Sequence, residues 1–303
     1  QPQNPLDYLS KRYFTYPYYS HELEKMNQET INHITFQYLG DLANFLNPNR
    51  TIITCHDIFT FLERNNLKNP YPLQKYAILG LKRCRQIISI SEFTKTELIN
   101  KLNIEGEKIV VIKNGLNHNM FYQMTSKEKE NIEPIAPNFI KILHVGSEVY
   151  RKDLITLLKA LYLVKKKKKV KLIRVGNAKH YDYIRKLGLE KDIIYLKNVS
   201  DDRIREIYNQ SDLFVFPSLY EGWGAPGLEA AACGLPVICT DIPIFKEVYK
   251  DYPQFFPPKN HKALANVILE VINNKKLKSE MVKRGLEVVN KYSWRKSAYK
   301  YLN

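Results

Sequence analysis

Two glutamates, Glu221 and Glu229, are eight residues apart where an apolar strand pattern gives way to a helix pattern. Pro226 suits the first helical position, where a missing N–H costs nothing. That placement predicts free N–H groups on Gly227 and Leu228, and a helix N-terminus binds anions through such donors and its dipole. Two carboxylates beside an anion site suit a nucleotide sugar, because they accept hydrogen bonds from sugar and ribose hydroxyls. In the plainer interpretation, Glu221 is a solvated loop residue and Glu229 only complements the helix dipole.

Three further side chains could complete such a site. Arg151 and Lys152 come shortly after an apolar strand and directly before a helical pattern. Cations at a helix N-terminus oppose its dipole, so we expect a compensating anion nearby, although a solvated helix turn is the plainer interpretation. His56, beside Asp57, directly follows the predicted strand Thr51–Cys55. A lone histidine there more often makes a structural hydrogen bond.

The composition is that of a globular protein with room for two domains. Of 303 residues, 44% are apolar, and no apolar stretch is long enough to span a bilayer. The start of the chain has no secretion signal pattern. The four cysteines form no CxxC pair, which favours buried free thiols in a reducing compartment. The net charge of +16 is concentrated after residue 125 and predicts a polyanionic or phosphorylated partner.

The elements that position these residues alternate between apolar strands and helices, a pattern typical of parallel sheets covered on both faces. We predict strands at Thr51–Cys55, Gln86–Ile90, Ile109–Ile112, Lys141–Val145, Lys171–Val175, Ile193–Leu196, Leu213–Phe216 and Val237–Thr240, with a weaker candidate at Ile34–Tyr38. Helices are expected at Leu73–Cys84, Phe93–Lys101, Leu154–Lys165, Tyr181–Leu187, Asp202–Gln210, Leu228–Cys233 and Ile244–Val248, followed by two or three more after His261. This alternation predicts two doubly wound domains, joined by a polar segment at Phe121–Asn138.

Several segments together resemble a known family. The segment Phe216–Ile238 begins at the end of a predicted strand. It then contains, in order, the pattern P-S-x-x-E-G-[FW]-G, a second glutamate and the pattern A-x-x-x-G-x-P-V. This resembles family 4 of the retaining glycosyltransferases, which have the GT-B fold. The order of the other matching segments agrees: Thr54–Asp57, Ile90–Leu98, Ile112–Phe121, His144–Asp153 and Tyr292–Trp294.

The resemblance implies two Rossmann-like domains facing across a cleft. We expect an acceptor-side domain at residues 1–122 that lacks its first elements, a donor domain at 123–290, and a helix at 291–303 that crosses back to the first domain. In the family the first glutamate lies beside the donor hexose, here Glu221, and a histidine reaches it across the cleft, here His56. A basic pair holds the diphosphate, which implies Lys152. Arg151 would supply the second charge, because Ser147 stands where the family often has arginine.

The donor-binding set implied by the resemblance is Gly146, Ser147, Gly222, Gly224, Gly227, Leu228 and Glu229, where Glu229 binds the ribose. We expect transfer of a hexose from a UDP- or GDP-sugar to a glycan, glycolipid or other hydroxyl acceptor, without cofactor or metal. The predicted location is cytoplasmic, with contact between Val164–Val170 and an anionic membrane left open. Alternatives are a nucleotide-sugar epimerase of related fold and a basic nucleic-acid-binding protein. The Lys-rich, Arg-poor composition disfavours a nucleic-acid partner.

Overall fold

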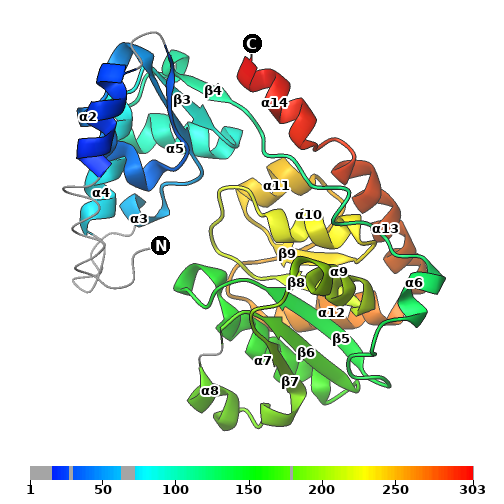
Figure 1. Cartoon of the computed structure of the whole chain (residues 1–303). Helices are drawn as coiled ribbons and strands as arrows, with labels where there is room; N and C mark the ends of the chain where they lie inside the picture. The colour runs from blue at the N-terminus through cyan, green and yellow to red at the C-terminus, as the bar shows by residue number, and fades with distance from the viewer. Residues whose placement is uncertain (1–15, 27–29, 63–71, 178–179, 303) are drawn as a thin grey trace. The chain divides into compact units, whose positions relative to one another are not determined.

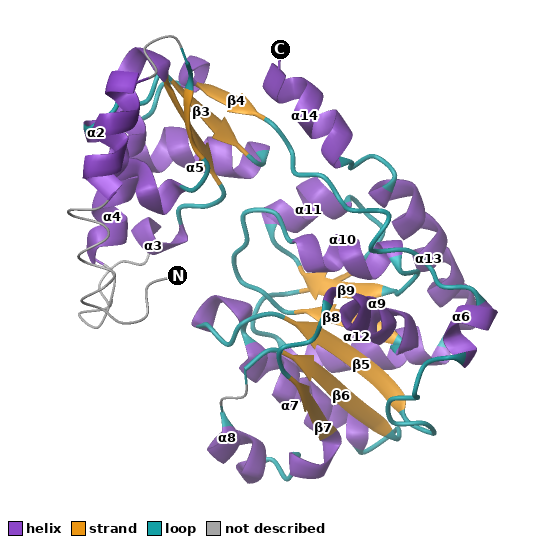
Figure 2. Ribbon diagram, in the orientation of Figure 1, coloured by secondary structure: helices purple, strands orange, loops and turns teal. Residues whose placement is uncertain are grey.

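The computed structural model describes residues 16–26, 30–62, 72–177 and 180–302. The chain divides into two compact units, Gln1–Lys113 and Asn114–Asn303. Each unit contains one parallel β-sheet, as the alternating pattern predicts (Figure 2). The division falls earlier than the boundary expected after residue 122.

The first unit has a four-stranded sheet in the order β1-β2-β3-β4. Its elements are α2 (Tyr16–Met26), β1 (Asn32–Ile34), η2 (Gln37–Asn44), η3 (Pro48–Arg50), β2 (Thr51–Cys55), α3 (Phe59–Leu62), α4 (Pro72–Leu79), η4 (Gly80–Arg83), β3 (Gln86–Ser89), α5 (Glu92–Leu102), η5 (Gly106–Lys108) and β4 (Ile109–Val111). The candidate strand at Ile34–Tyr38 is mostly wrong, because the strand ends at Ile34. Residues 37–44 form 3-10 turns whose Tyr38, Leu39 and Leu42 pack on the core of this unit.

The second unit has a six-stranded sheet in the order β10-β9-β8-β5-β6-β7, with every pairing parallel (Figure 1). Its strands are β5 (Ile140–Val145), β6 (Val170–Val175), β7 (Ile193–Leu196), β8 (Leu213–Phe216), β9 (Val237–Thr240) and β10 (Gln254–Phe256). The first five strands lie within one residue of their predicted bounds. β10 was not predicted, because it has only three residues and too short an apolar run to stand out.

Helices cover both faces of this sheet. The helices of this unit are α6 (Ser126–Glu130), η6 (Tyr150–Lys152), α7 (Leu154–Lys165), α8 (Tyr181–Lys186), η7 (Glu190–Asp192), α9 (Asp201–Gln210), α10 (Ala225–Ala232), α11 (Pro243–Tyr249), α12 (His261–Asn273), α13 (Lys275–Val289) and α14 (Trp294–Leu302). Side chains alternate along β8: Leu213 and Val215 join the cluster that contains α7 and α12. Phe214 contacts Tyr208 of α9, and Phe216 contacts Phe245 of α11, on the other face.

The connecting segment groups with the second unit because its side chains and backbone bond there. His118 Nε2 lies 2.8 Å from the Tyr292 carbonyl oxygen, and the Asn209 amide bonds to the backbone of Tyr122 and Met124. These contacts move the division to Lys113. The crossing of residues 291–303 to the first domain stays a prediction.

The strand order brings two distant loops together. β5 lies directly beside β8, and the sheet continues through β6 and β7 on one side and β9 and β10 on the other. Such a reversal of winding direction leaves a crevice at the carboxyl ends of the two central strands. The loops that follow β5 and β8 carry Lys152 and Glu221 respectively, so the topology predicts that these residues meet.

Two glycines shape the turns after β5 and β6. Gly146 has φ +144° and Gly176 has φ +137°, a region that side chains rarely adopt. A Cβ on Gly176 would overlap the Gly146 carbonyl oxygen and lie 2.8 Å from Arg174 Nη1. The two turns are therefore pressed together backbone to backbone.

We expect Gly176→Ala to lower the free energy of unfolding by about 2–4 kcal/mol, because strain and overlap add. Gly188→Ala is the control: Gly188 also has positive φ, at +61°, but a Cβ there would meet nothing within 4 Å. That control should lose only about 1 kcal/mol. Urea denaturation measures both losses. Equal losses would show that the close contact between the turns at Gly146 and Gly176 contributes nothing to the free energy of unfolding.

Candidate functional site

The centre of the site is the Glu221 carboxylate, held by two cations. Its Oε2 accepts a hydrogen bond from Arg151 Nη1 at 2.7 Å, and its Oε1 accepts one from Lys152 Nζ at 2.5 Å. Glu221 is 6% exposed and Lys152 is 7% exposed. The interpretation of Glu221 as a solvated residue is therefore wrong, and so is that of Lys152 as a solvated helix turn.

The loops after β5 and β8 fix this arrangement through their backbones. The Leu219 N–H donates to the Arg151 carbonyl oxygen at 2.7 Å, and Arg151 Nη1 also bonds to the Tyr220 carbonyl oxygen at 3.0 Å. Lys152 Nζ lies 4.9 Å from the centre of the Phe216 ring. Glu221 is thus the compensating anion that the basic pair was expected to need.

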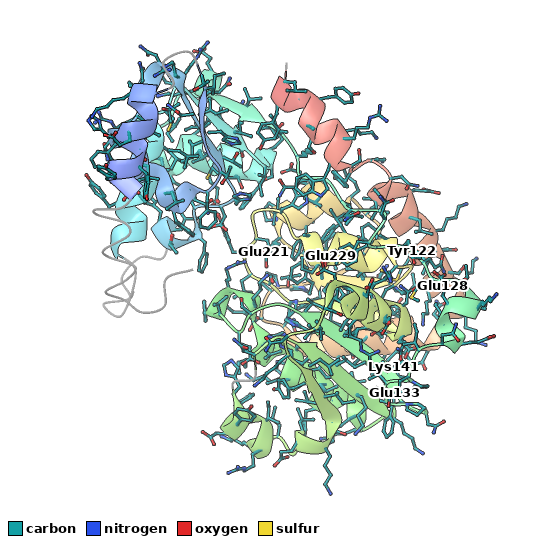
Figure 3. All side chains as sticks on the ribbon, in the orientation of Figure 1. Tyr122, Glu128, Glu133, Lys141, Glu221 and Glu229 are labelled. Carbon is teal, nitrogen blue, oxygen red and sulfur yellow. The ribbon has the colours of Figure 1, made fainter. Side chains whose placement is uncertain are left out.

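The second glutamate has a different environment. Glu229 lies in the second turn of α10, and its Oε2 accepts a hydrogen bond from the Tyr208 hydroxyl at 2.8 Å. Burial raises the pKa of the Glu229 carboxyl, and the Tyr208 hydrogen bond opposes that shift. Figure 3 labels both glutamates beside α10.

The start of α10 differs from the expectation in two details. The helix begins at Ala225, which makes Pro226 the second helical residue, and Gly224 with φ +90° precedes it. The Gly227 N–H is not free, because it donates to the Gly224 carbonyl oxygen at 3.1 Å. The extra residue before the proline lets Gly224 turn the chain into the helix.

A second layer of buried charge lies next to the turn at Gly146. Arg174 Nη2 donates to the Gly146 carbonyl oxygen at 2.6 Å, and Arg174 Nε lies 3.7 Å from Glu148 Oε1. His144 is fully buried, and burial together with the charges of Arg174 and Lys152 holds its pKa well below the usual range. His144 therefore stays neutral, and the positive charge beside Glu221 comes from Lys152 and Arg151.

His56 lies in the first unit, after β2. Its backbone N–H donates to Gln37 Oε1 at 3.1 Å, and its ring Nε2 lies 3.1 Å from the Thr35 carbonyl oxygen. The structural hydrogen bond is thus present. A role for His56 toward the donor stays a prediction.

The remaining predicted positions surround these contacts. Ser147 is exposed, whereas Gly222, Gly224, Gly227 and Leu228 are buried. A Cβ on Gly146 would lie 3.8 Å from Lys152 Nζ, so this glycine borders the basic pair. Tyr208, Arg174 and Glu148 were not predicted as site residues, because nothing in their spacing links them to residues far along the chain.

Among the described residues, no group of three or more His, Cys, Asp or Glu side chains is placed to hold a metal ion. Nor is any helix in those ranges long and apolar enough to cross a membrane. All four cysteines are buried and free, as expected.

Fold and sequence define the class of protein. The profile described as "Glycosyl transferases group 1" matches residues 125–288, and "Glycosyltransferase Family 4" matches residues 5–119. The UDP and glucose complex of Anabaena HepE has a similar structure, with a TM-score of 0.78 and 18% identity, over 93% of this chain and 79% of that one. The fold is GT-B and the protein is a glycosyltransferase. The chain belongs to the group 1 glycosyl transferase family and is of the family 4 type.

Two curated relatives are O-antigen enzymes. The chain is 29% identical over 229 residues to the O-antigen chain mannosyltransferase RfbU of Salmonella typhimurium, covering 72% of this chain and 60% of that protein. It is 26% identical over 283 residues to O-antigen chain mannosyltransferase B of Escherichia coli, covering 88% of this chain and 73% of that one. The match therefore spans only part of each relative.

The contact between Glu221 and the cations predicts how this site binds a bare anion. We expect Glu221→Gln to bind inorganic pyrophosphate several-fold more tightly, because the mutation removes the negative charge that neutralises both cations. Lys152→Ala should weaken that binding. Calorimetry in low salt measures both, and pyrophosphate binding that is unaffected by either change would place the anion site elsewhere.

Proposed function

We propose that this glycosyltransferase moves a hexose from a nucleoside diphosphate sugar to a hydroxyl of a glycan or glycolipid, with retention at the anomeric carbon. The observation that carries the proposal is the buried contact of Lys152 and Arg151 with Glu221 at the carboxyl ends of β5 and β8. A site with two cations and one carboxylate fits a diphosphate attached to a sugar. The cations match the phosphates, and the carboxylate accepts hydrogen bonds from the sugar.

The charges suit cleavage of the bond between the anomeric carbon and the diphosphate. As that bond breaks, the sugar becomes oxocarbenium-like and negative charge grows on the leaving diphosphate. Lys152 and Arg151 would stabilise that growing charge from fixed positions. As the acceptor hydroxyl attacks the anomeric carbon from the same face, its proton would pass to the departing diphosphate oxygen, and the configuration would be retained.

The ribose and the hexose would contact different glutamates. Glu229 would accept a hydrogen bond from a ribose hydroxyl, and Glu221 would face the hexose. Gly146, Ser147, Gly222 and Gly224 would line the donor, and His56 would reach the hexose from the other domain. Because Glu221 already bonds both cations, donor binding has to exchange part of these contacts for contacts to the diphosphate.

The relatives suggest mannose and an O-antigen-type glycan, since two of them are named O-antigen chain mannosyltransferases. The HepE complexes with UDP and with UDP-glucose support a uridine donor as the other candidate. UDP- and GDP-linked mannose and glucose are therefore the donors to compare first.

Donor turnover and nucleotide binding test the proposal together. We expect one donor of that set to be consumed with an acceptor glycan, and NMR of the product to show the donor's anomeric configuration. Glu229→Ala should weaken binding of the matching nucleotide by about 10-fold to 100-fold, as expected for a lost charged hydrogen bond of about 1.5–3 kcal/mol.

Lys152→Ala should instead reduce turnover by about 10²–10³ at saturating donor, by analogy with loss of one oxyanion donor. An inverted product contradicts retention. Nucleotide binding that Glu229→Ala leaves unchanged contradicts the ribose assignment.

We also propose that the lysine-rich end of α7 contacts an anionic membrane surface. Lys166, Lys167 and Lys169 are exposed, whereas Lys165 pairs with Asp192 at 2.7 Å. Together they border a hollow of about 390 Å³ just before β6. This is the amino end of the sheet, opposite the loops that carry Glu221, so a surface bound there would leave the donor loops open.

Vesicle co-sedimentation tests this contact. The chain should bind phosphatidylglycerol vesicles more than phosphatidylcholine vesicles, and the binding should fall with salt. Replacing Lys166, Lys167 and Lys169 by Glu should abolish the difference. The same change at Lys283, Lys291 and Lys296, all exposed, is the matched control. Equal losses in both variants, or tighter binding to an oligonucleotide than to the vesicles, would contradict a membrane site.

A further inference from the structure

Three buried tyrosines direct their hydroxyls to the first turns of α10. The Tyr208 hydroxyl donates to Glu229 Oε2 at 2.8 Å and lies 3.4 Å from the Pro226 carbonyl oxygen. Tyr249 donates to the Gly224 carbonyl oxygen, and Tyr252 donates to the Gly227 carbonyl oxygen at 2.9 Å. Each ring is at most 1% exposed, so the hydroxyls are held in place by packing.

Only Tyr208 bonds to a side chain that could reach a ligand. Its ring is fixed edge-on against Phe121 at 5.9 Å and lies 5.9 Å from Phe214 of β8. The strand thus holds the ring, and the ring holds one oxygen of the Glu229 carboxylate.

We propose that Tyr208 is a positioning residue for the donor: its hydroxyl occupies Glu229 Oε2 and so presents Oε1 to a ribose hydroxyl. The inference rests on the proposed function, in which Glu229 binds the ribose. It adds the group that orients Glu229 and favours the ionised form of its carboxyl.

The Tyr208 hydroxyl affects the ionisation of the Glu229 carboxyl as well as its orientation. Burial favours the neutral carboxyl and raises the pKa of Glu229, while the hydrogen bond from Tyr208 favours the carboxylate and lowers it. Loss of the hydroxyl leaves burial unopposed, so the pKa of Glu229 rises further. An ionised carboxylate is the stronger acceptor for a ribose hydroxyl, so binding should weaken as pH falls through that pKa.

Cys233 and Tyr249 are two titratable groups in this neighbourhood. Burial raises the pKa of the Cys233 thiol to about 12 and that of the Tyr249 hydroxyl well above its usual value, so both stay neutral near pH 7. Arg205 of α9 acts on Cys233 and pairs with Asp202 at 2.9 Å. Glu221, which acts on Tyr249, is paired with Lys152 and Arg151.

The test compares binding of UDP and GDP with that of their 2′,3′-dideoxy forms between pH 5.5 and 8.5. The ribose ratio is the dissociation constant of the dideoxy form divided by that of the unmodified nucleotide. It isolates the contribution of the ribose hydroxyls, because titration of the phosphates affects both constants equally and cancels. In the unmodified chain the ratio should fall as pH falls. Tyr208→Phe should reduce the ratio about 3-fold to 10-fold at pH 7.5 and move its midpoint to higher pH.

Three variants separate this inference from its premise. Glu229→Gln should lower the ribose ratio and remove its pH dependence. Tyr252→Phe loses a buried hydroxyl from the same helix end and should leave the midpoint unchanged. A 3-fluorotyrosine at position 208 keeps the ring and hydroxyl, and therefore the packing, while its more acidic hydroxyl is a stronger donor. That substitution should move the midpoint to lower pH even if Tyr208→Phe does not fold.

The outcomes point to different failures. A ribose ratio that Glu229→Gln leaves unchanged, or no binding of either nucleotide, overturns the ribose assignment and this inference with it. A ratio that responds to Glu229→Gln but not to Tyr208→Phe or to the fluorinated tyrosine overturns the positioning role alone. Equal midpoint shifts in Tyr208→Phe and Tyr252→Phe would show a general loosening of α10.

Discussion

One buried carboxylate between two cations determines how the loops of the second unit lie. Removing the charges of Glu221 and Lys152 from water is costly, and their mutual attraction offsets that cost only if the geometry is maintained. The backbone bond from Leu219 to Arg151 and the bond from the Arg151 side chain to the Tyr220 carbonyl oxygen maintain it. Breaking the contact by removing one partner would leave an uncompensated buried charge. A diphosphate can avoid that penalty, because it supplies negative charge to the same two cations.

The contact depends in turn on the order of the strands. Lys152 and Glu221 are 69 residues apart, and only the pairing of β5 with β8 brings the ends of their strands together. Both strands are buried on both faces, so their ends cannot slide without exposing Leu143 or Phe214. Close packing of the glycine turns at Gly146 and Gly176 then sets the position of the loop after β5. The sheet therefore acts as the rigid support, and the loops act as the site.

How much the sequence could predict follows from the range of each signal. Apolar runs and helix periodicity are local, and they placed α7, β2, β7, β8 and β9 at their observed bounds. The resemblance assigned Glu221 and Lys152 to one donor site, but their direct contact was not predicted, because strand order cannot be deduced from single segments. Tyr208 lies within the predicted helix Asp202–Gln210 but was not singled out, because its bond to Glu229 depends on how α9 and α10 pack. Pro226 indicated the start of α10 one residue late, and the predicted helix Leu228–Cys233 began three residues late, because a proline marks the first turn and not a particular position within it.

Glu221, in the loop after β8, and Glu229, in α10, therefore differ in the groups that bond to their carboxylates. Cations hold Glu221, so a ligand there has to compete for charge, and affinity for an anion responds to salt and to the charge of the carboxylate itself. A neutral hydroxyl holds Glu229 in a buried setting, so a ligand there responds to whether the carboxyl is ionised. Eight residues of separation place one group on a loop and the other inside a helix, and this gives each its own partner. A donor bridging both positions would then be recognised by charge at the diphosphate and by hydrogen bonding at the ribose.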